Sequence, residues 1–224
     1  MKVVYVLGKS SPGGSWTLVK SYCHLLTTAG DEAVVVVLST VGLSQNDVAL
    51  ALPEATDVRI LRLSSLLRDG YRTASLLASM LADWKPTLVH TFLLPADMVG
   101  GLAARMASVP CTRSIVGTPS LPTDLRSRVA TWKGETLVRA APFLVPWVAA
   151  ISQTARQRAL HLGLARAGRI DVVYPALPPR TLPTGSPGKG LPASKLGARR
   201  IVSMGRVIAS KGVFDEIRCC RKLL

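Results

Sequence analysis

Two cations near the end of the sequence are spaced as a phosphate-binding loop would need. Arg206 and Lys211 follow the apolar run 201–204, which is suited to a buried strand, and residues 213–224 have the apolar spacing of a helix. Arginine forms bidentate hydrogen bonds with phosphate, and lysine adds a mobile point charge. The order of strand, basic loop and helix therefore predicts an anion site, although an ordinary solvated basic loop fits the composition equally well.

A glycine-rich stretch follows the first apolar run of the chain. Gly8, Gly13 and Ser15 have the spacing of a P-loop, but Gly14 stands where its lysine would be, and the stretch does not match a dinucleotide fingerprint either. The pair Gly13 and Gly14 precedes a predicted helix, whose free N–H groups favour an anion. The alternative is a tight turn that requires positive φ.

His90 is a third candidate. It ends the predicted strand 87–90, at the edge where open α/β sheets bind ligands. A histidine whose hydrogen bonds are satisfied within the core is an equally compatible interpretation. The chain has three histidines with no metal-ligand spacing and four cysteines without a C-x-x-C pair, which predicts no metal site and reduced thiols in a cytosolic protein.

The stretch from Gly205-Arg206 to Lys211-Gly212 resembles the G-R-x(4)-K-G segment that opens the carboxy-terminal domain of GT-B glycosyltransferases, most closely the retaining family 4. The resemblance implies that Arg206 and Lys211 bind the diphosphate of an NDP-sugar donor. It also implies a role for Gly13, Gly14 and Ser15 at the interdomain cleft.

The order of predicted elements follows the family from residue 1 to 212, with one departure. Many relatives carry a histidine that contacts the transferred sugar where this chain has Gly117. Because a glycine cannot replace that contact, the resemblance leaves the handling of the sugar open at this position.

The predicted strands and helices that carry these residues alternate along the chain. Their order predicts an α/β fold over residues 1–175, a Rossmann-like three-layer sandwich with a mostly parallel sheet. The Pro- and Gly-rich segment 176–198 reads as a linker, and 199–224 as the incomplete start of a carboxy-terminal nucleotide-binding domain. The predicted strands are 2–7, 33–38, 58–61, 87–90, 111–116, 147–151 and 170–174, and the predicted helices are 15–29, 64–84, 96–107, 124–140 and 153–162.

The formal net charge of +15 favours an anionic partner, namely a sugar nucleotide, a membrane surface or a nucleic acid. The basic residues are scattered without an accompanying aromatic stacking motif, which argues against nucleic acid. No amino-terminal signal is evident, and the longest apolar stretch, 140–151, is too short to span a bilayer. We therefore expect a cytoplasmic protein, with possible peripheral association with the inner face of the membrane.

The resemblance implies transfer of a hexosyl group from an NDP-sugar, with retention and without a metal or other cofactor, to an acceptor such as a lipid-linked or cell-envelope glycan. The sequence ends before the E-x(7)-E segment of complete enzymes, so we expect a fragment, a truncated product or half of a split enzyme, with little or no transferase activity from these 224 residues. No catalytic base is assignable. Two alternatives remain open: a non-catalytic binding half completed by a partner, and a basic membrane-surface or nucleic-acid binder.

Overall fold

The computed structural model contains two compact units, Met1–Arg180 and Thr181–Leu224. The structure describes residues 1–8, 14–39, 52, 56–116, 136–137, 139–175 and 218. The whole linker expected over 176–198 lies outside the described residues, as do the strand, loop and helix expected over 201–224 apart from Arg218, and most of the helix expected over 124–140.

A seven-stranded parallel sheet forms the centre of the first unit, in the order β3-β2-β1-β4-β5-β6-β7. The strands are β1 (Lys2–Leu7), β2 (Glu32–Ser39), β3 (Asp57–Arg62), β4 (Leu88–Phe92), β5 (Cys111–Ile115), β6 (Trp147–Ala150) and β7 (Ile170–Val172). The chain winds outward from β1 to β3, then crosses back and winds outward from β4 to β7. This confirms the predicted Rossmann-like α/β class.

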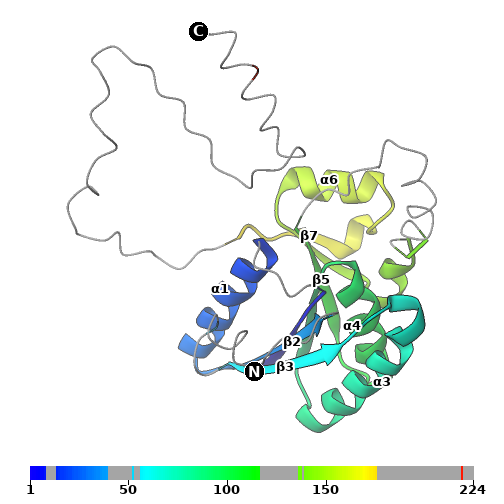
Figure 1. The fold of residues 1–224 in the computed structure, drawn as a ribbon. Helices are drawn as coiled ribbons and strands as arrows, with labels where there is room; N and C mark the ends of the chain where they lie inside the picture. Colours follow the sequence, from blue (N-terminus) through cyan, green and yellow to red (C-terminus); the bar gives the residue numbers. More distant parts are fainter. Residues whose placement is uncertain are drawn as a thin grey trace. The chain divides into compact units, whose positions relative to one another are not determined.

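Helices cover both faces of the sheet, which gives the three layers (Figure 1). The helices are α1 (Gly14–Thr28), α3 (Leu66–Trp84), α4 (Leu94–Met106) and α6 (Gln153–His161), with a single 3-10 turn at Ala167–Arg169. Helix α1 packs on one face, against the alternate side chains of β1 and β2 that include Val3 and Val35. Helices α3 and α4 pack on the other face, against Val4, Val6 and their neighbours.

The continuous apolar run of β2 forms a strand that is covered on both faces of the sheet. Every residue from Ala33 to Ser39 is buried, and so is every residue from Val3 to Leu7 in β1. A parallel strand in this position has no solvated face, so it carries no polar alternation.

The helix boundaries follow local signals with small differences. Helix α1 begins at Gly14, one residue before the predicted start, so Ser15 lies inside its first turn. Ser152 caps α6, because its hydroxyl oxygen accepts a hydrogen bond from the Ala155 N–H at 3.1 Å. Gly70 does not interrupt α3 and is a buried residue within it.

Close packing at Gly100 and Gly101 brings α4 against the sheet and against residues 144–145. A Cβ atom on Gly100 would lie 2.8 Å from Thr91 Cγ2, and one on Gly101 would lie 2.5 Å from Val145 Cγ2. Both distances are shorter than a carbon–carbon contact allows. The two glycines therefore set how closely α4 approaches its neighbours.

Replacing Gly101 with alanine should lower the free energy of unfolding by about 1–3 kcal/mol, because the added methyl group overpacks a full interior. Alanine favours helix over glycine by roughly 1 kcal/mol, and this gain is included in that range. Urea unfolding followed by circular dichroism measures the change. Gly168→Ala is the matched control, since a Cβ there meets nothing within 4 Å. If Gly101→Ala were no less stable than Gly168→Ala, α4 would be able to shift and accommodate the added methyl group.

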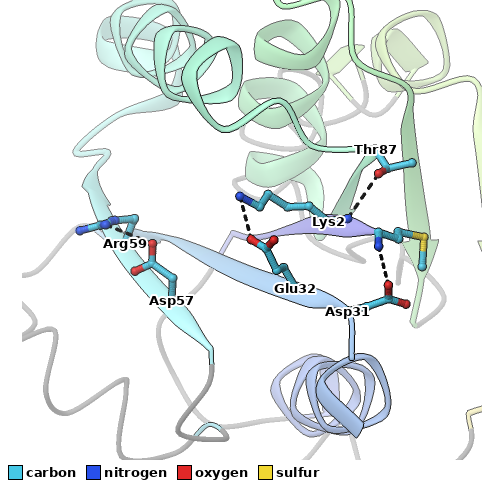
Figure 2. Close-up of polar contacts among 7 residues, drawn as sticks. Lys2, Asp31, Glu32, Asp57, Arg59 and Thr87 are labelled. Carbon is cyan, nitrogen blue, oxygen red and sulfur yellow. Dashed lines mark hydrogen bonds and ion pairs between the residues drawn. The ribbon is translucent and has the colours of Figure 1, made fainter. Parts of the chain in front are cut away.

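Ion pairs lie at the amino-terminal ends of the strands β1, β2 and β3 (Figure 2). Lys2 Nζ lies 2.8 Å from Glu32 Oε2, Arg59 Nη2 lies 3.0 Å from Asp57 Oδ2, and the amino group of Met1 contacts Asp31. These groups are at least partly hydrated, so each pair contributes between about 0 and 1 kcal/mol. They are therefore at the opposite end of the strands from the carboxyl ends, where a ligand is expected.

Candidate ligand crevice at the switch point of the sheet

The winding of the sheet reverses between β1 and β4. The connection after β1 leads to α1 on one face, whereas the connection after β4 leads to α4 on the other face. Open α/β sheets bind their ligands in a crevice beyond the carboxyl ends of the strands at such a reversal, so this position is the candidate site. Gly8 follows β1 and Leu93 follows β4, so both residues lie at this point.

Gly8 allows the two strand ends and α4 to meet. Its N–H donates to the Phe92 carbonyl oxygen at 3.1 Å. A Cβ atom on Gly8 would lie 3.1 Å from both Ala96 N and Pro95 Cδ, which belong to the first turn of α4. A larger residue would push this turn away from β1, so Gly8 sets how closely α4 approaches the end of β1 at the candidate site.

Of the predicted glycine loop, the structure describes Gly14 and Ser15, in the first turn of α1. Gly14 is the first residue of this helix, and a Cβ atom there would meet nothing within 4 Å. Among the described glycines, positive φ occurs at Gly30 and Gly163 but not at Gly14, so the tight-turn explanation does not apply to it. The first turn of α1 carries no acidic side chain that would compete for an anion at its N–H groups. Gly13 lies outside the described residues.

His90 lies in the middle of β4 rather than at its end, which corrects the sequence prediction. The strand extends two residues further than expected, to Phe92, because Thr91 and Phe92 continue the pairing with β1. His90 therefore faces α1 from within the sheet, and the crevice edge of β4 is formed by Leu93 instead.

Polar and aromatic groups surround His90. Its Nε2 lies 2.8 Å from Ser114 Oγ and its Nδ1 lies 3.5 Å from Thr112 Oγ1, both on β5. The imidazole ring contacts the rings of Phe92, Tyr5 and Tyr22, at centroid separations of 4.7, 6.0 and 6.4 Å. Burial lowers the pKa of His90 to about 4, because this environment solvates the imidazolium poorly. These contacts hold a neutral histidine in the sheet, which matches the structural interpretation of this residue.

A buried ionic network beneath the crevice was not foreseen from the sequence. Asp97, in the first turn of α4, accepts a hydrogen bond from Thr91 Oγ1 at 2.6 Å and from Arg113 Nη1 at 3.3 Å. Arg113 Nη2 also donates to the carbonyl oxygen of Leu164. Burial raises the pKa of Asp97, and the Arg113 charge opposes that rise. The network connects β4, β5, the start of α4 and the segment after α6.

One signal in the sequence could have revealed this network. Arg113 lies on β5 and pairs with the buried Val148 on β6. A charged residue that faces the core requires a buried partner. Asp97, in the helix that covers this face of the sheet, is the carboxylate within reach. The pairing depends on the tertiary fold, so the sequence pattern alone did not identify it.

The structure leaves several predicted site residues untested. Arg206, Lys211 and Gly117 lie outside the described residues, so no geometry joins them to the crevice. Within the described part of the chain, no group of three or more His, Cys, Asp or Glu side chains could hold a metal ion. The helices described here include none that is both long and apolar enough to cross a bilayer.

Comparisons with known proteins place this geometry in context. The family model described as Glycosyltransferase Family 4 matches residues 12–180. No protein among the curated ones matches the sequence.

Solved structures share the fold at low sequence identity. HepE of Anabaena, determined with UDP and glucose, superposes with a TM-score of 0.58 at 18% identity, covering 78% of this chain and 44% of HepE. The lipopolysaccharide outer core galactosyltransferase WaaB gives 0.54 at 14% identity, covering 78% of this chain and 45% of WaaB. A UDP-N-acetylglucosamine 2-epimerase gives 0.56 at 16% identity, covering 77% and 47%.

Two facts follow from these superpositions. This chain spans less than half the length of each of these three proteins. The same fold occurs in transferases and in an epimerase, so the fold by itself does not decide between the two reactions.

Proposed function

Because the chain belongs to glycosyltransferase family 4, we propose that it takes part in the transfer of a hexosyl group from an NDP-sugar to an acceptor, with retention of anomeric configuration. The observation that carries the proposal is the family match over residues 12–180, which covers the sheet from α1 to β7. The switch point between β1 and β4 supports it, since open α/β sheets bind their ligands beyond the strand ends at such a point.

The proposed donor is a uridine diphosphate sugar. HepE has been determined in complex with UDP-glucose, and the structural likeness of this chain to HepE extends over 78% of the chain. Arg206 and Lys211 are the proposed ligands of the donor diphosphate, where they would neutralise the charge that develops on the leaving group. Retention, the acceptor and the sugar are parts of the proposal.

The proposed acceptor is a lipid-linked or cell-envelope glycan, reached from the cytoplasmic face of a membrane. The net charge of +15 supports this placement, because anionic lipid surfaces attract basic proteins. Cys23 and Cys111 are free thiols, which suits a reducing compartment.

Replacing Arg206 with alanine should weaken UDP-glucose binding by about 10- to 100-fold, since a hydrogen bond to a charged group contributes roughly 1.5–3 kcal/mol. Lys211→Ala should weaken it to a similar or smaller extent. Isothermal titration calorimetry with UDP-glucose measures both effects.

Arg218→Ala is the matched control for charge, because it removes one cation from the same end of the chain outside the predicted loop. Equal losses in all three variants would mean that binding depends on net charge alone. Specific recognition requires that uridine compete with UDP-glucose for binding and that inorganic diphosphate alone bind more weakly. An unmodified protein that binds no UDP-sugar would contradict the proposed function.

A further inference from the structure

Two large aromatic side chains are exposed where the chain enters β6. Phe143 lies near the end of the helical residues 139–144 and is 74% exposed, and Trp147 is the first residue of β6 and is 51% exposed. Their Cα atoms lie within about 14 Å of each other, because so few residues separate them along the chain. Isolated apolar residues are common on protein surfaces, whereas large ones that gather together indicate a contact surface.

Two arginines extend this exposed area across the start of β7. Arg166 precedes and Arg169 ends the 3-10 turn that leads into β7, and both side chains are exposed. Because Val148 on β6 pairs with Ile170 on β7, the residues that precede them are neighbours. The Arg169 Cζ atom lies 5.5 Å from the centroid of the Trp147 ring, which is a cation–π distance. The Arg169 N–H donates to the Arg166 carbonyl oxygen at 2.9 Å, and residues at this spacing in a 3-10 turn stand on the same side. We call these four residues the basic-aromatic surface: Phe143, Trp147, Arg166 and Arg169.

The charge around the basic-aromatic surface has one sign over a long stretch of sequence. Every residue between Thr136 and Ile170 that is charged at pH 7 is an arginine, namely Arg139, Arg156, Arg158, Arg166 and Arg169. Asp171 comes next and is also exposed, on β7 beyond the 3-10 turn. Arginine binds phosphate groups bidentately, and tryptophan rings settle at the headgroup level of a bilayer. The combination of exposed rings with cations of like sign therefore matches an anionic lipid surface.

Helix α3 also exposes large apolar side chains, but its charges are balanced. Leu67 and Tyr71 are each 72% exposed. The two arginines of this helix are offset by two aspartates within it: Arg68, Arg72, Asp69 and Asp83. One of these pairs is in direct contact, since Arg68 Nε lies 3.2 Å from Asp69 Oδ1. Exposed apolar groups are thus common to both surfaces, whereas the unbalanced positive charge belongs to the sequence that forms the basic-aromatic surface.

We propose that the basic-aromatic surface docks on an anionic lipid bilayer, with its aromatic rings among the headgroups and its arginines on the lipid phosphates. Arg169 stands over the Trp147 ring. That face of the indole is therefore not open to stacking against a nucleic-acid base, which favours lipid as the partner. The surface lies at the amino ends of β6 and β7, whereas the candidate ligand site lies at the carboxyl ends of β1 and β4. Docking does not involve the ligand site, so the inference does not rest on the proposed function.

Vesicle co-sedimentation of the full 224-residue chain tests the proposal. The probes are vesicles of phosphatidylcholine alone and of an equimolar mixture of phosphatidylcholine and phosphatidylglycerol. The surface variants are Phe143→Ser, Trp147→Phe and Arg169→Gln. Tyr71→Ser and Arg72→Gln on α3 are the matched controls, because they remove a similarly exposed aromatic ring and the same charge elsewhere. Each replaced side chain is exposed, so the variants should keep the fold of the unmodified chain, which circular dichroism verifies.

We expect the unmodified chain to bind the anionic vesicles and to bind phosphatidylcholine alone far more weakly. Arg169→Gln should weaken binding about fivefold, since a basic residue near an anionic surface contributes about 1 kcal/mol. Phe143→Ser should weaken binding at least as much. The α3 variants should bind within about twofold of the unmodified chain, because charges far from the membrane are screened by salt.

Tryptophan fluorescence locates the contact independently of affinity. Brominated lipids in the anionic vesicles should quench the fluorescence of the bound chain, because a ring at the headgroup level approaches the bromine atoms. Trp147→Phe keeps an aromatic ring and should retain binding, but most of the quenching should disappear with the indole. Isothermal titration with UDP-glucose should give the same affinity for Phe143→Ser and Arg169→Gln as for the unmodified chain, since the two sites are separate.

Several outcomes would overturn the inference. Equal binding to both kinds of vesicle, or to neither, would remove the anionic bilayer as the partner. Equal losses in the surface variants and the α3 variants would mean that overall charge, rather than this surface, attracts the membrane. Quenching that persists in Trp147→Phe would place a different tryptophan at the bilayer. Single-stranded RNA that displaces the vesicles, and whose own binding falls in the same variants, would make this a nucleic-acid surface instead.

Discussion

Replacing Asp97 with alanine should lower the free energy of unfolding by about 3–5 kcal/mol, because the change leaves the buried Arg113 guanidinium without its counter-charge. Asp97 is 6% exposed and Arg113 is 4% exposed, so water cannot replace the lost carboxylate without opening the core. The Nε atom of Arg113 already lacks a hydrogen-bond partner among the described residues, so the carboxylate of Asp97 is difficult to replace. Urea unfolding monitored by circular dichroism gives the change directly.

A double-mutant cycle separates the ion pair from simple loss of packing. The cycle uses Asp97→Leu, Arg113→Met and the double variant. Each single change should destabilise the protein, because it leaves the partner charge buried and unpaired, and the double variant should be less destabilised than the sum of the two single changes. Replacement of a buried pair by apolar residues of similar size is often close to neutral.

The exposed pair of Lys2 and Glu32 supplies the control for charge removal. Its side chains are hydrated, so Glu32→Gln should change stability by less than about 1 kcal/mol. Additive effects of Asp97 and Arg113 in the cycle would show that the two residues contribute independently and that no ion pair forms.

The strands and the mostly parallel character of the sheet were predictable from the sequence because their signals are local. Continuous apolar runs such as 33–38 leave few alternatives to a strand buried on both faces. The glycine pair at Gly100 and Gly101 indicated close packing because a helix interior otherwise disfavours glycine. The family resemblance rested on short motifs arranged in the expected order, and a family model independently matches most of the same span.

The features that the sequence did not reveal depend on several strands at once. No glycine or proline marks the end of β4 within Thr91-Phe92-Leu93, so only the pairing with β1 shows that the strand runs past His90 to Phe92. The positive φ of Leu93, 73°, has no sequence signature, since leucine rarely adopts it. Asp97 and Arg113 are 16 residues apart in the sequence. They meet only because α4 leads the chain back so that β5 pairs with β4.

The stability of the protein should fall by about 3 kcal/mol between pH 7 and pH 4 through His90 alone. Its pKa is near 4 in the folded state and close to 6.5 in an unfolded chain, because burial disfavours the imidazolium. The unfolded state therefore binds more protons than the native state between these values, and the free energy of unfolding rises with pH in this window. The contribution is complete above about pH 6.5 and is lost progressively as the pH falls toward 4.

Two variants isolate this effect in urea unfolding measured from pH 4 to pH 8. His90→Gln keeps a hydrogen-bonding group within reach of Ser114 but cannot take up a proton, so its stability should vary much less with pH and should cross that of the parent protein at low pH. The exposed His161 is the matched control, and His161→Gln should leave the slope unchanged. A parent-like slope in His90→Gln would mean that carboxylates, rather than this histidine, produce the pH dependence. The neutral imidazole between α1 and β5 would then contribute packing and hydrogen bonds without coupling the fold to pH.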